Sequence, residues 1–221
     1  MRSGLLDLLR TSLLIVGALF PIVNPLGSAP IFLALTRGFS SSTRTMLAGR
    51  IALNGFILLT SSILIGTHIL AFFGISLPVV QVAGGMVVIA TGWALLNQKD
   101  ENAIDGGTEQ LVSPAAISMR AFYPLTLPLT VGPGSISVAI TVGANRPEGT
   151  QSNWPILLAE VIGPALIAVS IYLSYRFAEV IADALGETAM SVILRLSSFI
   201  LLCIGVQIGW NGISGLLGSV R

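Results

Sequence analysis

The stretch FPIVNPLGSAP at residues 20–30 lies in the middle of a long apolar segment and contains three prolines, an asparagine and a glycine. A proline in a helix interior removes an N–H donor and clashes with the preceding turn, at a cost of about 3 kcal/mol or more. Inside a bilayer no water satisfies the freed carbonyl groups, so such a break survives only within protein or beside a wet cavity. The stretch therefore predicts a membrane-spanning helix that is broken near its centre.

A second stretch of the same kind, PLTLPLTVGPGS at residues 124–135, follows in the second half of the chain. Paired broken helices in the two halves of a membrane protein are the best sequence-level pointer to the binding site of a transporter. The alternative is that both are ordinary proline kinks, which are common in membrane helices. The matching positions of the two breaks favour a site.

The composition is that of a membrane protein. The chain has 221 residues, of which 53% are hydrophobic and 10% are charged, and its mean hydropathy is +0.89. Soluble domains carry roughly 25% charged residues. The net charge of +1 comes with scattered basic residues, so no nucleic-acid partner is indicated. Cys203 is the single cysteine, which excludes an internal disulfide and a cysteine-based metal site, and no cofactor is expected.

Six segments have the roughly 20 apolar residues that are needed to cross a bilayer. The first could be mistaken for a signal peptide, but its apolar run continues to Leu35, well past the usual length of such a peptide. The fold class is therefore an all-α polytopic membrane protein. The expected spans are Leu8–Leu35 (interrupted at Asn24–Ser28), Leu47–Leu70, Pro78–Leu96, Ala116–Gly143 (interrupted between Pro124 and Gly134), Trp154–Tyr175 and Ala189–Leu217.

The two halves of the chain resemble each other in order. Ile22–Ser28 matches Thr130–Ser135, and Phe73–Gly74 matches Leu185–Gly186. Each half holds three spans, so the second half enters the membrane from the opposite side and the repeat is inverted. Chance similarity between apolar segments is the alternative. The expected division is a first three-helix repeat at 1–96, a polar linker at 97–115 and a second three-helix repeat at 116–221.

The distribution of lysine and arginine orients the chain, because cytoplasmic loops carry an excess of these residues. Seven lie on the side that holds the connections between spans 1–2, 3–4 and 5–6, and four lie on the side of the termini. We therefore expect a multi-pass protein of the cytoplasmic (inner) membrane with both termini extracytoplasmic. The two sets are Arg37, Arg44, Arg50, Lys99, Arg120, Arg176 and Arg195 against Arg2, Arg10, Arg146 and Arg221.

The breaks supply groups that suit a small zwitterion. The second half-helices begin near Leu26 and Gly134, and each N-terminus carries free N–H donors and about half a positive charge. In an inverted repeat these ends converge and can hold a carboxylate, while the carbonyl groups before the breaks suit an ammonium group or a small cation. The predicted substrate-binding residues are Asn24, Pro25, Gly27, Ser28, Thr126, Thr130, Gly132, Gly134 and Ser135.

Two further expectations concern bulk and helix contacts. Valine at Gly27 or Gly134 should abolish binding without unfolding the protein, because backbone and ligand approach closely there. Asn54 and Gln81 are polar residues within spans and are expected to form hydrogen bonds between helices.

Glu160 is the only acidic residue well inside a span. It lies about 9 Å beyond Trp154 at roughly 1.5 Å per helical residue. An intramembrane carboxylate is by default a functional candidate, for instance as a proton-coupling site. The alternative is a structural carboxylate that reaches the headgroups or caps a neighbouring helix.

The two motifs resemble those of the MarC family of bacterial and archaeal inner-membrane proteins. The resemblance covers the whole chain. The best-described branch of that family is similar to transporters of small neutral amino acids such as alanine and glycine, and it is grouped with LysE-like exporters. The stretches that carry the resemblance are Phe20-Pro21, Asn24–Gly27, Phe73–Ile75, Ala83–Gly85, Pro124–Pro128, Gly132–Gly134 and Gly205–Gln207.

The leading interpretation is a secondary transporter for small neutral amino acids. No nucleotide-binding loop of the Walker type is present, so the driving force would come from an ion gradient, of H⁺ or Na⁺, or from a partner. A passive channel or facilitator for a small polar solute, an exporter of another substrate, and a membrane protein that transports nothing are the alternatives. An enzyme is not expected, because the sequence shows neither a nucleophile–base pair nor a metal cluster.

Overall fold

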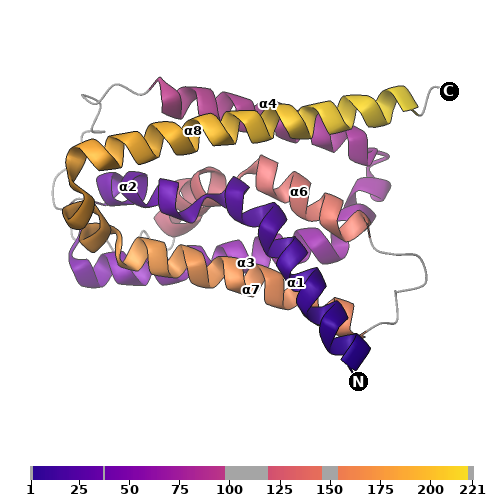
Figure 1. The fold of residues 1–221 in the computed structure, drawn as a ribbon, viewed down its shortest axis with the longest axis horizontal. Coiled ribbons are helices and arrows are strands. Elements are labelled where there is room, and N and C mark those ends of the chain that lie inside the picture. The colour runs from indigo at the N-terminus through magenta and orange to yellow at the C-terminus, as the bar shows by residue number, and fades with distance from the viewer. Residues whose placement is uncertain (1, 37, 98–118, 146–153, 219–221) are drawn as a thin grey trace.

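The computed structural model describes residues 2–36, 38–97, 119–145 and 154–218, which form a bundle of helices (Figure 1). These ranges contain no strand, and the predicted all-α fold is confirmed. The elements are α1 (Arg2–Val23), α2 (Pro25–Leu35), α3 (Ser41–Phe72), α4 (Leu77–Leu96), the short π-type helix η1 (Ala121–Thr130), α6 (Pro133–Ala144), α7 (Trp154–Arg176) and α8 (Ala178–Gly218).

The bundle holds five to six candidate membrane spans. Five helical stretches are long and apolar enough to span it, and η1 with α6 forms a pair bent by 68° that makes a sixth when counted as one. Figure 1 places the start of α1 and the end of α8 at the same end of the bundle, which requires an even number of crossings. The five are Gly4–Leu33, Ser41–Phe72, Leu77–Leu96, Trp154–Arg176 and Ser191–Gly218.

Most span limits lie close to the predicted ones. The main difference is α3, which begins at Ser41 rather than Leu47 because the Ser40 side chain accepts a hydrogen bond from the Thr43 nitrogen at 3.2 Å. Such an N-cap satisfies one of the free N–H groups at a helix start. The predicted linker at 97–115 lies outside the described residues apart from Asn97.

The inverted repeat is visible in the contact between α4 and α8. A β-carbon built on Gly92 would lie 3.0 Å from the Ser198 carbonyl oxygen, and one on Gly212 would lie 2.6 Å from the Pro78 carbonyl oxygen. Adding 120 to the number of a residue in α4 gives its counterpart in α8, and exchanging each residue for its counterpart turns one of these contacts into the other. The counterparts are Pro78 and Ser198, Val82 and Leu202, Gly85 and Gly205, and Gly92 and Gly212.

The remaining helix contacts are paired in the same way. Helix α1 packs on α7 as η1 packs on α3, α2 contacts α7 as α6 contacts α3, and α2 contacts α8 as α6 contacts α4. Helices α3 and α7, which correspond to each other, also pack together. Exchange of the two halves thus leaves the pattern of contacts unchanged, as expected for an inverted repeat.

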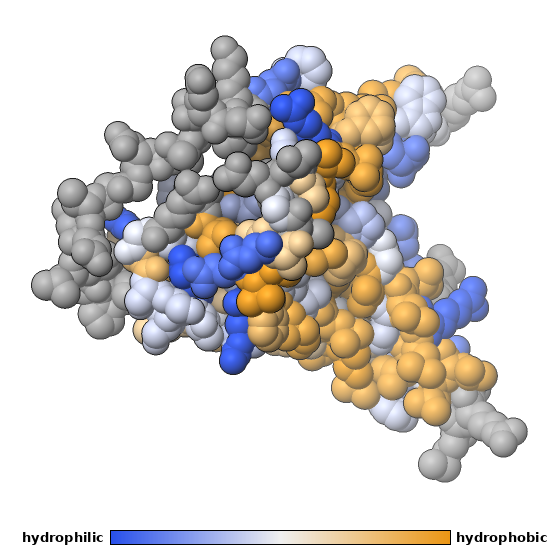
Figure 2. Space-filling model, turned by 60° about the vertical axis from the view of Figure 1, so that its left-hand side comes forward, coloured by the Kyte–Doolittle hydropathy of each residue, from blue (hydrophilic) through white to orange (hydrophobic). Residues whose placement is uncertain are grey.

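The core and the surface are both apolar. Buried side chains from α1, α2, α3 and α7, including Leu19, Phe32, Ile51 and Ile171, form the main core cluster. Figure 2 shows broad hydrophobic areas on the outside of the bundle. Because no water-facing domain would expose this much apolar surface, lipid is the natural neighbour of these side chains.

The α4–α8 contact gives a test of the fold. A β-carbon on Gly85 would lie 2.6 Å from the Gly209 backbone nitrogen and 2.7 Å from the Gly205 carbonyl oxygen, whereas one on Gly209 would meet nothing within 4 Å. Gly85→Ala should therefore destabilise the protein by about 1–3 kcal/mol through overpacking, and Gly209→Ala should be close to neutral. Thermal unfolding of both variants in detergent measures this. Equal shifts of the melting temperature would contradict the observed close contact.

Candidate functional site

The first break is a single residue. Asn24 has φ 45° and ψ 60°, and its side-chain oxygen accepts a hydrogen bond from the Gly27 nitrogen at 3.2 Å. Asparagine tolerates this left-handed conformation better than most residues. Pro25 then opens α2 at the first helical position, where its missing N–H is not needed. The break is therefore confirmed but narrower than the expected Asn24–Ser28.

The second break is longer and is built from two copies of Pro-Leu-Thr, at residues 124–126 and 128–130. In each copy the threonine hydroxyl donates to the carbonyl oxygen five residues earlier, at 2.6 Å from Thr126 and 2.7 Å from Thr130. These hydroxyl groups satisfy carbonyl oxygens within a segment that prolines prevent from forming a regular α-helix. The chain then bends at Val131 and Gly132 before α6 begins.

The N-termini of α2 and α6 differ in capping. Helix α2 is capped by Asn24 as described above, while α6 follows Gly132 and has no side-chain cap. The Ser135 hydroxyl donates to the Gly132 carbonyl oxygen at 2.9 Å and leaves the first N–H groups of α6 uncapped. The two helix starts are thus equivalent in position but not in hydrogen bonding.

A cavity of about 90 Å³ lies between the two breaks. Seven of the nine residues predicted from the sequence line it: Asn24, Gly27, Ser28, Thr130, Gly132, Gly134 and Ser135. Pro25 is buried at the start of α2, and Thr126 is fully buried and accepts a hydrogen bond from the Asn54 amide at 3.4 Å. Those two residues do not line the cavity.

The sequence analysis did not identify the other walls of the cavity. Helix α4 contributes Val87, Val88, Thr91 and Leu95, and helix α8 contributes Ser197, Ser198 and Leu201. The pair of serines in the apolar final span is the one signal that could have pointed to α8. No charged side chain belongs to the described lining, in which six residues carry a hydroxyl group: Ser28, Thr91, Thr130, Ser135, Ser197 and Ser198.

The cavity leads toward one end of the bundle. Its lining extends to Ile31 in α2 and to Leu95 near the end of α4, on the side of the α2–α3 and α7–α8 connections. Toward the opposite end α4 is held against α6. There the Gln81 amide donates to the Thr141 hydroxyl at 3.2 Å, and the Ser137 hydroxyl donates to a carbonyl oxygen of α4 at 3.2 Å. The expected interhelical hydrogen bonds of Asn54 and Gln81 are both confirmed.

Tyr175 is a neighbour of the cavity that the sequence analysis did not single out. It lies in the last turn of α7 and is 2% exposed. Its hydroxyl oxygen is 2.7 Å from the Thr130 hydroxyl, and its ring stacks on Phe32 with 4.5 Å between ring centroids. A tyrosine beside Arg176 at the end of a span is more typical of the membrane interface, so its sequence position gave no signal.

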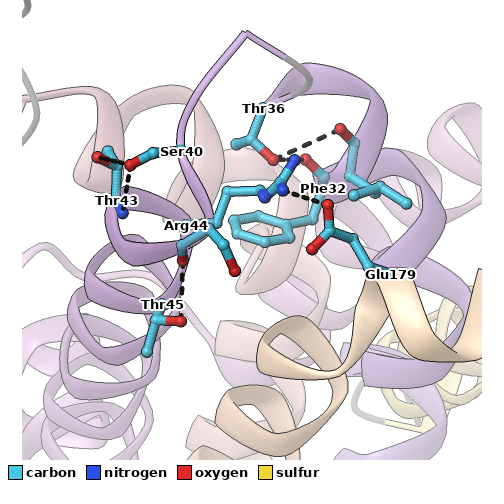
Figure 3. A network of polar contacts seen from close by, with 9 residues as sticks. Phe32, Thr36, Ser40, Thr43, Arg44, Thr45 and Glu179 are labelled. Atoms are coloured by element: carbon cyan, nitrogen blue, oxygen red, sulfur yellow. Dashed lines mark hydrogen bonds and ion pairs between the residues drawn. The ribbon is translucent and has the colours of Figure 1, made fainter.

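An ion pair between Arg44 and Glu179 lies at the end of the bundle to which the cavity leads. Figure 3 shows Arg44 of α3 reaching Glu179 at the start of α8, with Phe32 and Thr36 of α2 beside them. The Thr36 hydroxyl donates to the Phe32 carbonyl oxygen at 2.7 Å and closes the last turn of α2. The ion pair joins α3 to α8, and the hydrogen bond of Thr36 lies within the end of α2.

Glu160 does not line the cavity. It is 2% exposed and lies on α7, one turn before Gly163. A β-carbon built on Gly163 would lie 2.5 Å from the Ile15 side chain of α1. Residues three apart on a helix share a face, so Glu160 lies on the face that packs on α1. This burial is incompatible with a carboxylate that extends into the headgroups.

Added bulk at Gly27 or Gly134 would meet neighbouring side chains as well as a ligand. A β-carbon on Gly134 would lie 1.9 Å from Cγ2 of Val88, and one on Gly27 would lie 2.3 Å from Nδ2 of Asn24. Valine at either position must therefore displace α4 packing or the cap of α2. These glycines thus serve helix packing and capping as well as the cavity, and the expectation that such variants keep an intact fold stays a prediction.

These features define an integral membrane protein of six spans, built as an inverted repeat in which two broken helices meet at one uncharged cavity. The model of the MarC family integral membrane proteins matches residues 10–217, and the chain belongs to this family. It is 31% identical to the inner membrane protein MarC of Escherichia coli (strain K12) over 215 residues, which cover 95% of this chain and 96% of the relative.

A second relative comes from a different group of bacteria. The chain is 29% identical to the membrane protein YvbG of Bacillus subtilis (strain 168) over 199 residues, which cover 90% of this chain and 92% of the relative. No solved structure matches the chain. The name of the Escherichia coli relative places it in the inner membrane, as expected here for this chain.

Proposed function

We propose that this protein is a secondary transporter that moves small neutral amino acids, of the glycine, alanine and serine class, across the cytoplasmic membrane. The observation that carries the proposal is that both helix breaks line one cavity that has no charged side chain among its described residues. Its volume of about 90 Å³ is well below the roughly 300–1,000 Å³ of pockets for drug-sized ligands. A small solute of zero net charge suits this space.

The two ends of a zwitterion find different partners in the cavity. The uncapped N-terminus of α6 offers the main-chain N–H groups of Gly134 and Ser135 and the positive end of the helix dipole to a carboxylate. The N-terminus of α2 is already capped by Asn24, so α6 is the better carboxylate site. The ammonium group would then lie toward Ser28 and the end of α1, where Ile22, Val23 and Asn24 line the cavity.

The competing function is passive conduction of a small polar solute, which the same uncharged cavity would also permit. Uptake of labelled alanine or glycine into proteoliposomes, with and without an imposed pH or Na⁺ gradient, separates the two. Accumulation above the external concentration that requires a gradient supports the transporter. Simple equilibration that ignores both gradients supports the facilitator.

Filling the cavity should stop transport. Ser197 lines the cavity from α8, whereas its neighbour Leu196 is 58% exposed on the outside of the same helix. Ser197→Phe should lower alanine uptake at least tenfold because the ring occupies the space of the solute, and Leu196→Phe should leave uptake within about twofold, as expected for an exposed substitution without a structural role. Initial uptake rates at equal protein incorporation measure this. Unchanged uptake by Ser197→Phe would place the pathway elsewhere.

Glu160 is the proposed coupling residue, because a carboxylate buried in a membrane helix is costly to keep without a role. Glu160→Gln should weaken the dependence of uptake on the pH gradient while alanine binding in detergent stays within about threefold. The comparison is uptake with and without a pH gradient for both proteins. If the variant retains the full response to the gradient, Glu160 is structural and coupling lies at another group.

We propose that both termini are extracytoplasmic, from the excess of basic residues on the opposite side. The cavity then leads toward the cytoplasm in this structure. Reporter fusions after residue 221 should be active only when the reporter works outside the cytoplasm. Activity of a cytoplasm-only reporter at this position would reverse the orientation of the cavity.

A further inference from the structure

Two amide side chains face outward from the last span. Gln207 and Asn211 lie one turn apart on α8 and are both exposed, and the Gln207 amide donates to the Asn211 side-chain oxygen at 2.9 Å. Within the described residues neither side chain has another hydrogen-bond partner. Gln207 lies about three turns before Gly218, where the span ends. Polar side chains so far inside a span are costly to keep in lipid, so this surface of α8 needs another explanation.

The packing of α8 on α4 shows which surface carries these amides. A β-carbon built on Gly85 would lie 2.7 Å from the Gly205 carbonyl oxygen, and one built on Gly205 would lie 3.0 Å from the Gly85 carbonyl oxygen. Like the contacts of Gly92 and Gly212, these two are exchanged when each residue is replaced by its counterpart 120 positions away. Main-chain atoms make these contacts, so α4 and α8 pack as a two-fold symmetric pair even where their side chains differ.

The exposure of the two helices follows the same symmetry. Residues 85–94 of α4 and residues 205–214 of α8 show the same order of buried, half-buried and exposed positions. A residue of α8 therefore has the same place in the pair as its counterpart in α4, but on the opposite side of the two breaks, as an inverted repeat requires. The surroundings of an exposed residue in α4 thus indicate the role of its counterpart in α8.

The exposed residues of α4 form two stripes with different surroundings. Val87 and Thr91 line the cavity, whereas Met86, which is 60% exposed, does not. Their counterparts in α8 are, in the same order, Gln207, Asn211 and Val206. The two amides of α8 therefore occupy the positions of the cavity wall, and an apolar residue occupies the position that faces away from the cavity.

We propose that Gln207 and Asn211 line the solute pathway on the side of the breaks opposite to the cavity and bind the solute there. The inference rests on the proposed function, since it extends the same pathway toward the end of the bundle that holds the termini. Figure 1 shows the start of α1 and the end of α8 apart at that end, and in Figure 2 the surface is hollowed between them. On this side the Gln81–Thr141 hydrogen bond holds α4 against α6.

The amide pair suits a zwitterion. Because the Gln207 nitrogen donates to Asn211, the Gln207 oxygen remains to accept from an ammonium group, and the Asn211 nitrogen keeps two N–H donors for a carboxylate. Neither side chain is charged, which matches the uncharged lining that the described residues give the cavity. In the cavity wall the counterpart pair offers only the Thr91 hydroxyl, so the two sides of the pathway differ in polarity.

The accessibility of single cysteines to water tests the inference. Cys203→Ser removes the single cysteine, which is exposed, and Gln207→Cys or Asn211→Cys is added to this background. A charged methanethiosulfonate reacts with the thiolate, which does not form in lipid, so in proteoliposomes both cysteines should react about tenfold faster than the matched control Val206→Cys. Saturating alanine should slow both reactions about threefold or more, because the bound solute covers them.

Removal of the amides gives a second measurement. Gln207→Leu combined with Asn211→Leu keeps side chains of similar size without polar atoms, so the initial rate of alanine uptake should fall about tenfold, of the order of one hydrogen bond to a charged group. Val206→Leu on the apolar stripe should leave uptake within about twofold. The melting temperature of the double variant in detergent should not fall, because apolar side chains replace polar ones on an exposed face of a span.

The outcomes separate this inference from the proposed function, with Thr91→Cys as the reference inside the cavity. Alanine that slows the reaction of Thr91→Cys but not of Gln207→Cys, or full uptake by the double leucine variant, overturns the inference and leaves the transport proposal in place. Equal reaction of Gln207→Cys and Val206→Cys, or disulfide-linked dimers of Gln207→Cys, places this face against lipid or a second copy and also overturns it. If the parent protein takes up no alanine and alanine protects no cysteine, the proposed substrate class fails, while fast reaction of Gln207→Cys still supports its place on the pathway.

Discussion

The constraint on which the rest of this structure depends is the hydrogen bonding of main-chain groups inside a bilayer, where water cannot replace a missing partner. Prolines interrupt two of the six spans, and each break satisfies the constraint differently. In the first, one left-handed asparagine caps the next helix and the chain continues at once. In the second, two threonine hydroxyls bond carbonyl oxygens five residues back. Both solutions bring polar atoms into the interior of an apolar bundle, and the cavity lies between them.

These different solutions matter because the scaffold around them is symmetric. A shift of 120 residues exchanges the glycine contacts of α4 and α8, and the other helix contacts are paired in the same way. A strictly symmetric cavity would treat the two ends of a dipolar solute alike. Here the start of α2 is capped by Asn24 and the start of α6 is not, so the two ends of the cavity differ in donor and acceptor groups.

Local features of the sequence predicted most of the fold. The length of the apolar segments predicted the spans. The Pro/Gly stretches predicted the starts of the two half-helices to within one residue of Pro25 and Pro133, because the preference for proline at the first helical position can be read from the local sequence. Contacts between distant helices were not predictable in this way. Ser197 and Tyr175 are ordinary residues in their own spans and acquire a place at the cavity only when α7 and α8 pack on the breaks. For the same reason the sequence could not show that Gly134 packs against Val88.

The direction in which the cavity leads follows from side chains rather than from the scaffold. On the closed side, Gln81 of α4 donates to Thr141 of α6. In the other half of the repeat, Leu201 of α8 is the counterpart of Gln81, by the shift of 120 residues. Leu33 of α2 is the counterpart of Thr141, because Pro25 is the counterpart of Pro133. The corresponding pair is therefore apolar. Leu201 lines the cavity. A hydrogen bond between two helices opposes their separation, because both polar groups would lose their partner. Two leucines form no such bond and do not oppose separation in this way. Hydrogen bonds between α4 and α6, of which the Gln81–Thr141 pair is one, therefore distinguish the closed side of the bundle from the side to which the cavity leads.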